Sequence, residues 1–337
     1  MKRFICAVIC IIMAFSALSV SAANVPNFMK QDYNNYTADY NMSLSFKSGA
    51  ELDALFEEID VKDEMSRQVD IQSFFETLLT STEKANLQYS ISEDYKKIDV
   101  ALVSEVNQKI KPNVNLDVDI KAKSGMWLHA DVAKQEFTFA VSMPYIQKYA
   151  IVDASEFEDE VKAVFFATLD TILNKDTINP IKEAVMELLL KHADVSMKSS
   201  KCVVKYDNDA LIATLDEFVG YILTLSEEFG VPADEEIPSF EGLTFLGDKG
   251  ITITYNLKGT KMGSIDMKAD FAINISEIYT KFSGEEWPYE TEGKLEFEFK
   301  SKEDISKLGT TKPVIPEFTE ENSFSIVEEF FGSFGEV

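Results

Sequence analysis

The stretch YTADYNMSLSF at residues 36–46 decides the fold, because apolar and polar residues alternate along its whole length. Its apolar side consists of the even positions, Tyr36, Ala38, Tyr40, Met42, Leu44 and Phe46. The same alternation returns at 114–120 and at 265–275. Successive side chains of a strand point to opposite faces, so these segments predict a sheet with one apolar and one polar face.

Other segments extend this pattern into a full set of elements. Strands are predicted near 86–92, 97–106, 113–123, 126–133, 136–143, 147–152, 196–206, 250–257, 264–276 and 292–300. Apolar residues spaced three and four apart predict helices near 52–59, 70–79, 156–173, 177–189 and 207–230. Short connections between the early strands indicate an antiparallel meander.

A sheet with one apolar face needs a cover, and the helices supply it. We therefore expect an α+β fold in which a large antiparallel sheet curls into a half-barrel and helices cover its concave apolar face. Ten side chains are expected to face those helices: Ala38, Tyr40, Met42, Leu44, Val114, Leu116, Val118, Met267, Phe271 and Ile273. The concavity either holds a ligand cavity or is packed throughout, and the pattern fits both.

The first residues predict export. Lys2 and Arg3 precede an apolar run, and Ala22 offers a small residue for cleavage, so residues 1–22 are expected to be a signal peptide. The alternative is a retained membrane anchor. Removal of Lys2 and Arg3 takes the formal charge from −26 to −28. Such acidity argues against nucleic acid and anionic membrane surfaces as partners, and the expected location is secreted or in the cell envelope.

Catalytic and metal-binding motifs are not found in the sequence. The chain has two histidines, His129 and His192, and after signal cleavage one cysteine, Cys202. His129 is expected on the polar face of its strand, and His192 at the end of a helix. These residues are too few and too scattered for a zinc site. No phosphate loop, nucleophile elbow or EF-hand spacing is present. We expect no cofactor, no metal and no enzymatic activity.

Three segments carry a resemblance to a known family. Residues 125–128 (GMWL), 135–139 (QEFTF) and 149–153 (YAIVD) form successive hairpins before a helical insertion. In this the chain resembles the LolA/LppX-like lipoprotein-carrier superfamily over residues 33–305, taken as a single domain. It is also similar to clostridial secreted modules of unknown function that can precede a copper amine oxidase N-terminal-like domain. The resemblance implies binding of acyl chains or other hydrophobic ligands in the concavity.

Two functions follow from this reading. The first is a non-catalytic, monomeric binder of a lipid or other hydrophobic ligand. Its expected ligand-binding residues lie on the helices near 156–173 and 209–229: Phe165, Leu169, Phe218 and Ile222. The second is a structural or protein-interaction module of the bacterial cell envelope with no small-molecule ligand. Residues 310–337 are expected to form an acidic tail whose apolar patch either docks on the domain or stays free.

Overall fold

The computed structural model describes residue 26, residues 28 and 29, and residues 33–48, 80–113, 116–143, 146–228 and 239–326. The expected signal peptide and the helices expected near 52–59 and 70–79 lie outside these residues. So do Val114, the side chains of Leu116 and Val118, and the end of the tail from residue 327.

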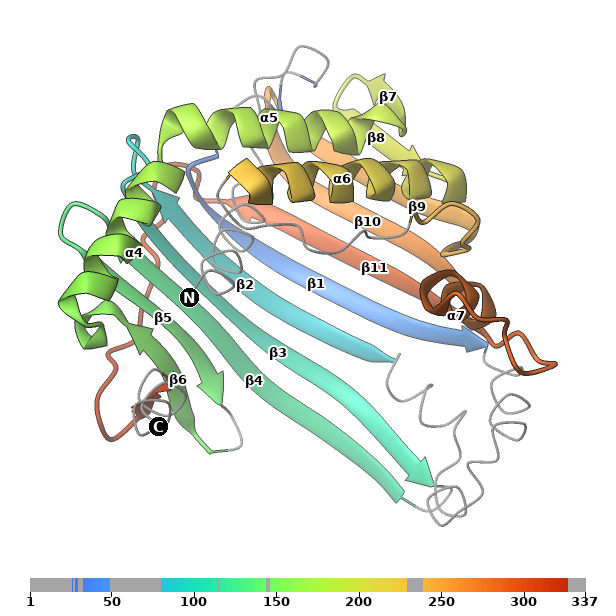
Figure 1. The fold of residues 1–337 in the computed structure, drawn as a ribbon, viewed down its shortest axis with the longest axis horizontal. Helices are drawn as coiled ribbons and strands as arrows, with labels where there is room; N and C mark the ends of the chain where they lie inside the picture. Colours follow the sequence, from blue (N-terminus) through green and yellow to red (C-terminus); the bar gives the residue numbers. More distant parts are fainter. Residues whose placement is uncertain are drawn as a thin grey trace.

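Twelve strands form one sheet that is not closed into a barrel (Figure 1). Their spatial order is β12-β6-β5-β4-β3-β2-β1-β11-β10-β9-β8-β7. The bounds are β1 Asn35–Ser48, β2 Ser81–Ile91, β3 Lys97–Asn113, β4 Leu116–Asp131, β5 Glu136–Met143, β6 Lys148–Asp153, β7 Asp194–Lys198, β8 Lys201–Tyr206, β9 Leu246–Lys258, β10 Lys261–Asn274, β11 Lys294–Ser306 and β12 Ser323–Ser325. Every pair is antiparallel except β12 on β6, which is parallel. The predicted α+β class and large curled antiparallel sheet are confirmed.

Helices lie over one face of this sheet (Figure 1). They are α4 Asp159–Ile172, α5 Lys175–Lys191, α6 Asn208–Glu228 and the short α7 Ile275–Ser283, with a 3₁₀ turn at Ala154–Glu156. Asparagine or aspartate begins three of them: the side chain of Asn174 accepts from Asp176 N, Asp207 from Ala210 N, and Asn274 from Ser276 N. Such caps satisfy N–H groups that have no partner inside the helix.

The alternation of residues 36–46 produces the expected faces. Ala38 is fully buried, and Tyr40, Met267 and Phe271 pack against the main hydrophobic cluster under the helices. Met42, Leu44 and Ile273 are half-buried, whereas Asp39 is exposed. The register continues the apolar face across strands, because Ala38 lies opposite Leu87 on β2 and opposite Ile305 on β11.

Two strands predicted at 113–123 and 126–133 are in fact one strand, β4. Gly125 lies in the gap between the two predicted strands, and in the structure it belongs to β4, beside the ring of Trp127. A Cβ atom at Gly125 would lie 2.2 Å from that ring. Glycine at this position leaves room for the Trp127 ring, which lies against its own strand. In the sequence, a glycine with this role looks the same as a glycine in a turn.

The strand predicted at 196–206 is in fact a hairpin, β7 and β8. The turn consists of Ser199 and Ser200, and Ser199 adopts a left-handed φ of 37°. Serine at such a position lacks the glycine or asparagine that marks tight hairpins, so the turn escaped sequence analysis. The strand predicted at 264–276 also ended two residues too late, because Asn274 ends β10 and caps α7.

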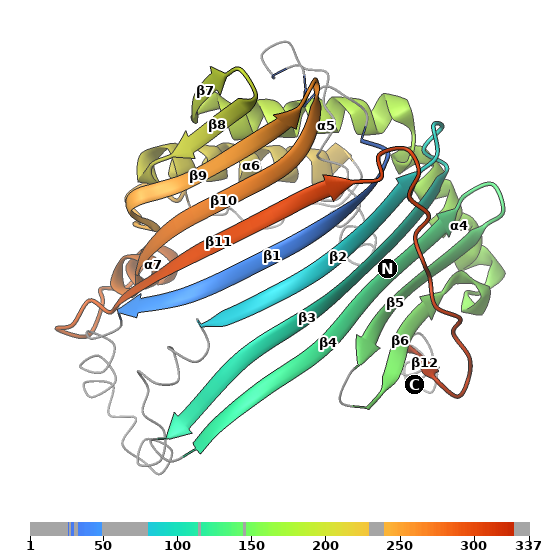
Figure 2. The same ribbon diagram turned by 180° about the vertical axis from the view of Figure 1, so that it is seen from behind.

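Residues 307–325, here called the strap, leave β11 and run over the face opposite α4, α5 and α6 to end as β12 (Figure 2). Asn35 holds its beginning through two hydrogen bonds with Thr311, at 2.6 and 2.7 Å. Further along, Ile315 and Phe318 pack on a second cluster made of Ala101, Trp127 and Ala140. Residues 310–325 of the expected tail therefore lie on the sheet, whereas its apolar patch lies, beyond Ile326, outside the described residues.

None of the helices in the described ranges is long and apolar enough to cross a membrane.

Candidate functional site

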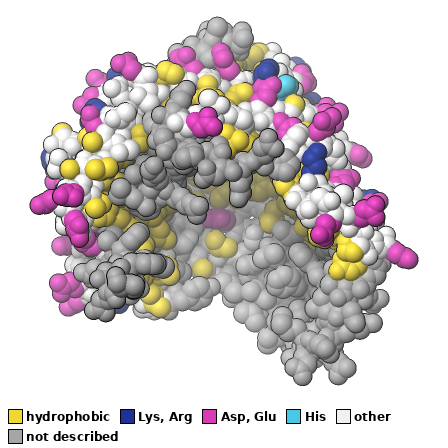
Figure 3. All heavy atoms as spheres, viewed as in Figure 1, with side chains coloured by type: hydrophobic (Ala, Val, Ile, Leu, Met, Phe, Trp, Pro, Cys, Tyr) yellow, Lys and Arg dark blue, Asp and Glu magenta, His cyan; other side chains and the backbone are white. Residues whose placement is uncertain are grey.

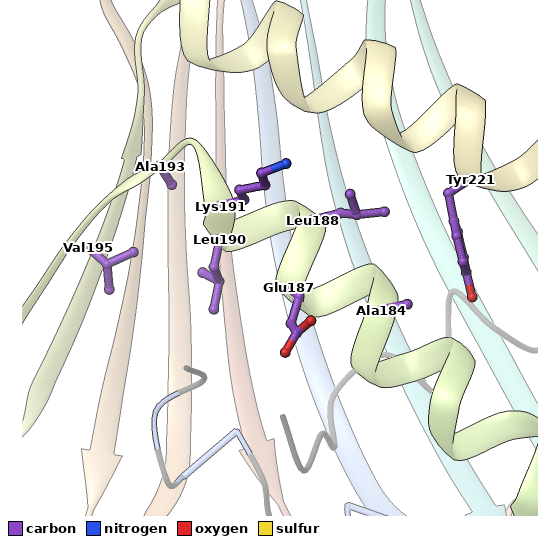
Figure 4. Close-up of a pocket in the computed structure, with 8 residues that line it drawn as sticks. All are labelled: Ala184, Glu187, Leu188, Leu190, Lys191, Ala193, Val195 and Tyr221. Carbon is purple, nitrogen blue, oxygen red and sulfur yellow. The ribbon is translucent and has the colours of Figure 1, made fainter. Parts of the chain in front are cut away.

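A groove with a volume of about 880 Å³ lies between α5, α6 and β7 (Figure 4). Ligand pockets commonly have volumes of about 300–1,000 Å³ and mostly apolar walls. Six of the lining residues are apolar or aromatic, namely Ala184, Leu188, Leu190, Ala193, Val195 and Tyr221. Glu187 and Lys191 are the charged residues among the described residues of the lining.

Local sequence positions each wall of the groove. The Asn174 cap fixes the start of α5, and His192 ends that helix, so its last two turns carry Ala184 through Lys191. The chain then turns directly into β7, which brings Val195 beside the end of the helix. Tyr221 comes from α6, which packs alongside α5. In Figure 4 its side chain points from α6 toward the α5 side of the groove.

Lys191, one of the charged residues of the groove, takes part in an ion pair. The Lys191 ammonium donates to Glu217 Oε1 at 2.6 Å, and His192 Nε2 lies 3.0 Å from the same oxygen. These bonds, that of Lys191 first, hold the pKa of Glu217 below its ordinary value. Because Lys191 is already paired, the described lining offers a ligand apolar side chains and the carboxylate of Glu187. His192 closes its helix as the sequence predicted.

The four residues predicted to bind ligand fall into two groups. Phe165 and Leu169 on α4 are fully buried in the main cluster, and the Phe165 ring lies 4.9 Å from that of Phe137 on β5. Phe218 and Ile222 on α6 are half-buried. None of the four lines the groove, although Tyr221 is the direct neighbour of Ile222. The sequence pattern had assigned the apolar stripe of α6 to the interior and passed over Tyr221.

A buried acid lies on the same helix-covered face of the sheet. Glu303 on β11 is 8% exposed, and the Tyr40 hydroxyl donates to it at 2.9 Å. Burial raises the pKa of Glu303 to about 7, against the opposing effect of the Tyr40 bond. The space-filling view of this side shows hydrophobic side chains in a central hollow and acidic side chains around its rim (Figure 3). The strand predicted at 292–300 ends before Glu303, whereas β11 continues to Ser306, so the sequence gave no sign of the burial of this acid.

The remaining reactive groups have structural surroundings. Burial raises the pKa of the Cys202 thiol, which is inaccessible. His129 is half-buried, and its Nδ1 lies 2.6 Å from Asp99, which raises the pKa of the imidazole. Within the described ranges, no three His, Cys, Asp or Glu side chains are arranged to hold a metal ion.

Comparison with known proteins adds little. No protein-family model matches the chain, and no curated protein matches it. Among solved structures, the chain is similar to a beta-barrel-like protein of the domain of unknown function DUF1849 from Brucella abortus. The identity is 9%, the match covers 81% of this chain and 98% of that one, and the TM-score is 0.22. A TM-score this low carries no argument about function.

Proposed function

We propose that the protein is an exported, non-catalytic binder of a lipid or another hydrophobic ligand, held between the helices and the half-barrel of the sheet. The groove between α5, α6 and β7 carries the proposal, since its volume of about 880 Å³ suits a single acyl chain. Burial of apolar surface contributes roughly 25 cal/mol per Å². The expected affinity for a fatty acid is micromolar by order of magnitude.

Two substitutions distinguish ligand binding in the groove from binding at the site predicted on α4 and α6. Ala184→Trp fills the groove from α5, whereas Phe218→Trp enlarges a side chain of the α6 stripe. Uptake of a fluorescent fatty acid is then measured by titration for each variant. We expect Ala184→Trp to abolish uptake and Phe218→Trp to leave it nearly unchanged.

Val164→Trp is the matched control, because Val164 is exposed on α4 and lies outside the groove. Loss of uptake in Phe218→Trp alone would move the ligand to the residues predicted from the sequence. Absence of uptake by the unmodified, folded protein would end the carrier proposal. Native mass spectrometry of freshly purified protein gives an independent readout through co-purified lipid.

One observation favours the second function, a structural or interaction module of the cell envelope. Phe165 and Leu169 are packed in the core, so the α4 side of the concavity is filled by the protein's own side chains. A sheet packed in this way supports a rigid scaffold as readily as a carrier. The test is the same titration, in which a scaffold binds no fatty acid and carries no lipid through purification.

A further inference from the structure

Strand β7 is an edge strand of the sheet formed by the described residues. It pairs with β8 on one side and ends the strand order on the other. All five of its residues, Asp194 to Lys198, are exposed. An edge strand presents unpaired N–H and C=O groups, which are a template for pairing with another strand. The opposite edge strand of the described sheet is β12 of the strap, which has three residues and covers part of β6.

The sequence of β7, DVSMK, is complementary to itself in the antiparallel direction. When two copies pair around a two-fold axis at Ser196, Asp194 of each copy lies opposite Lys198 of the other. Val195 then lies opposite Met197 on the other face. Opposite charges and apolar pairs directly across from each other both favour a strand pair.

The apolar pair of this register falls on the side of the groove. Val195 and Met197 pair in register with Val204 and Cys202 of β8, both buried, so they belong to the helix-covered face of the sheet. Val195 is 38% exposed and Met197 is 53% exposed. Val195 also lines the groove. Pairing would bury both side chains.

The charges near β7 also allow two copies of the chain to approach each other at this edge. The net charge of −26 opposes self-association of the whole chain. However, β7 and β8 carry Lys198, Lys201 and Lys205 against a single acid, Asp194. At physiological ionic strength charges farther than about 8 Å apart are largely screened. The acidic bulk of one copy therefore has little effect at the edge of the other.

We propose that two copies of the chain associate through antiparallel pairing of their β7 edges about Ser196, which joins the two sheets into one. The interface is isologous, as in most two-fold dimers. A five-residue strand is short, so the dimer is expected to depend on protein concentration. This replaces the monomer expected from the sequence, and it does not rest on the proposed ligand.

Charge reversal tests the register. Asp194→Lys leaves like charges opposite each other across the pair, and so does Lys198→Asp. We expect sedimentation equilibrium to show each variant as a monomer at concentrations where the parent chain dimerises. An equal mixture of the two variants restores opposite charges at both positions, so the mixture should dimerise again. Lys201→Asp, in the same hairpin but on β8, is the control and should dimerise like the parent.

Cross-linking tests the position of the axis. Adjacent antiparallel strands hold directly opposite Cα atoms about 4.5–5.5 Å apart, within the range of a disulfide. With oxidised glutathione, Ser196→Cys should give a covalent dimer, and Ser200→Cys in the hairpin turn should not exceed the parent chain. A parent that stays monomeric at every concentration overturns the proposal. So does a dimer that survives both single charge reversals, because its contact must lie elsewhere. Fatty-acid uptake by the reversed variants should stay unchanged, since neither residue lines the groove.

Discussion

The two faces of the sheet bury apolar side chains in different ways. Under α4, α5 and α6 a single large cluster extends from Tyr36 on β1 to Cys202 on β8. Under the strap the buried cluster is small, with Ala101, Trp127 and Ala140 covered by Ile315 and Phe318. Rings of Trp127, Tyr149 and Phe318 meet there edge to face. The first face provides most of the buried surface, and the second fastens the end of the chain.

The largest effect is expected on the helix side. Phe165→Ala removes a ring packed among Phe137, Phe157 and Phe166, and such a change costs about 3–5 kcal/mol of unfolding free energy. Val164→Ala on the same helix changes a side chain that is 53% exposed and should stay within about 0.5 kcal/mol. Urea denaturation measures both. Equal costs would show that α4 does not cover the sheet.

The buried acid gives the helix side a dependence on pH. In the folded chain the pKa of Glu303 is raised to about 7, from an ordinary 4.5. Burial disfavours the ionised carboxylate and leaves the protonated form stable. The contribution of Glu303 to the free energy of unfolding is therefore complete below about pH 4.5 and is lost as pH rises through about 7. Glu303→Gln should therefore be more stable than the parent at pH 8, by about 2–3 kcal/mol.

The readout for Glu303 is the difference between variant and parent in urea titrations at several pH values. This difference cancels the contributions of other carboxylates, such as Glu298, whose pKa is held at about 2 by lysines beginning with Lys300. A difference that does not change between pH 4.5 and pH 8 would contradict the burial of the Glu303 carboxyl.

A smaller effect is expected on the strap side. Phe318→Ala removes one ring of the aromatic cluster and should cost about 1–2 kcal/mol, because this ring is half-buried rather than enclosed. The fluorescence emission of Trp127 should shift to longer wavelength as water reaches its ring. Val314→Ala is the matched control, since Val314 is 70% exposed on the same strap. An unchanged spectrum in Phe318→Ala would mean that the strap does not cover Trp127.

The smallest change in stability is expected when glycine is replaced by alanine at either of two positions. Gly220 lies in α6 with open space where a Cβ atom would point, so Gly220→Ala should stabilise the chain by about 0.5–1 kcal/mol. Gly125→Ala should destabilise it, because the added Cβ meets the Trp127 ring. Thermal melting distinguishes the two signs. A gain in melting temperature for both would contradict the close approach of Trp127 to its own strand.

The helix side was predictable because it follows the period of two. Residues such as Ala38, Tyr40 and Met267 share a face by spacing alone. The strap side was not, since Ala101, Trp127 and Ala140 occupy positions that the same rule assigns to water. They are buried by a segment some two hundred residues away in the sequence, and no local pattern records that contact. The groove was missed for a related reason: β7 was read as part of one longer strand.

The candidate site shows the same limit. Phe165 and Leu169 were correctly recognised as inward-facing, but the sequence does not say whether inward-facing residues line a space or fill it. The groove instead depends on where α5 ends relative to the β7 edge. That relation is set by the tight passage from His192 to Asp194, which no composition rule describes.

The place of β1 in the sheet also sets an order of events in time. This strand, near the beginning of the chain, pairs in the middle of the sheet with β11, which ends at Ser306. Until β11 has been synthesised, β1 and β10 lack the strand that lies between them, and the two halves of the sheet are not joined. Completion of the sheet therefore has to wait for nearly the whole polypeptide, and such distant pairings are slow to form. The strap follows β11 in the chain and crosses the half of the sheet that leads from β1 to β6, so a chain that ends before β11 would lack both the central strand pair and the strap (Figure 2).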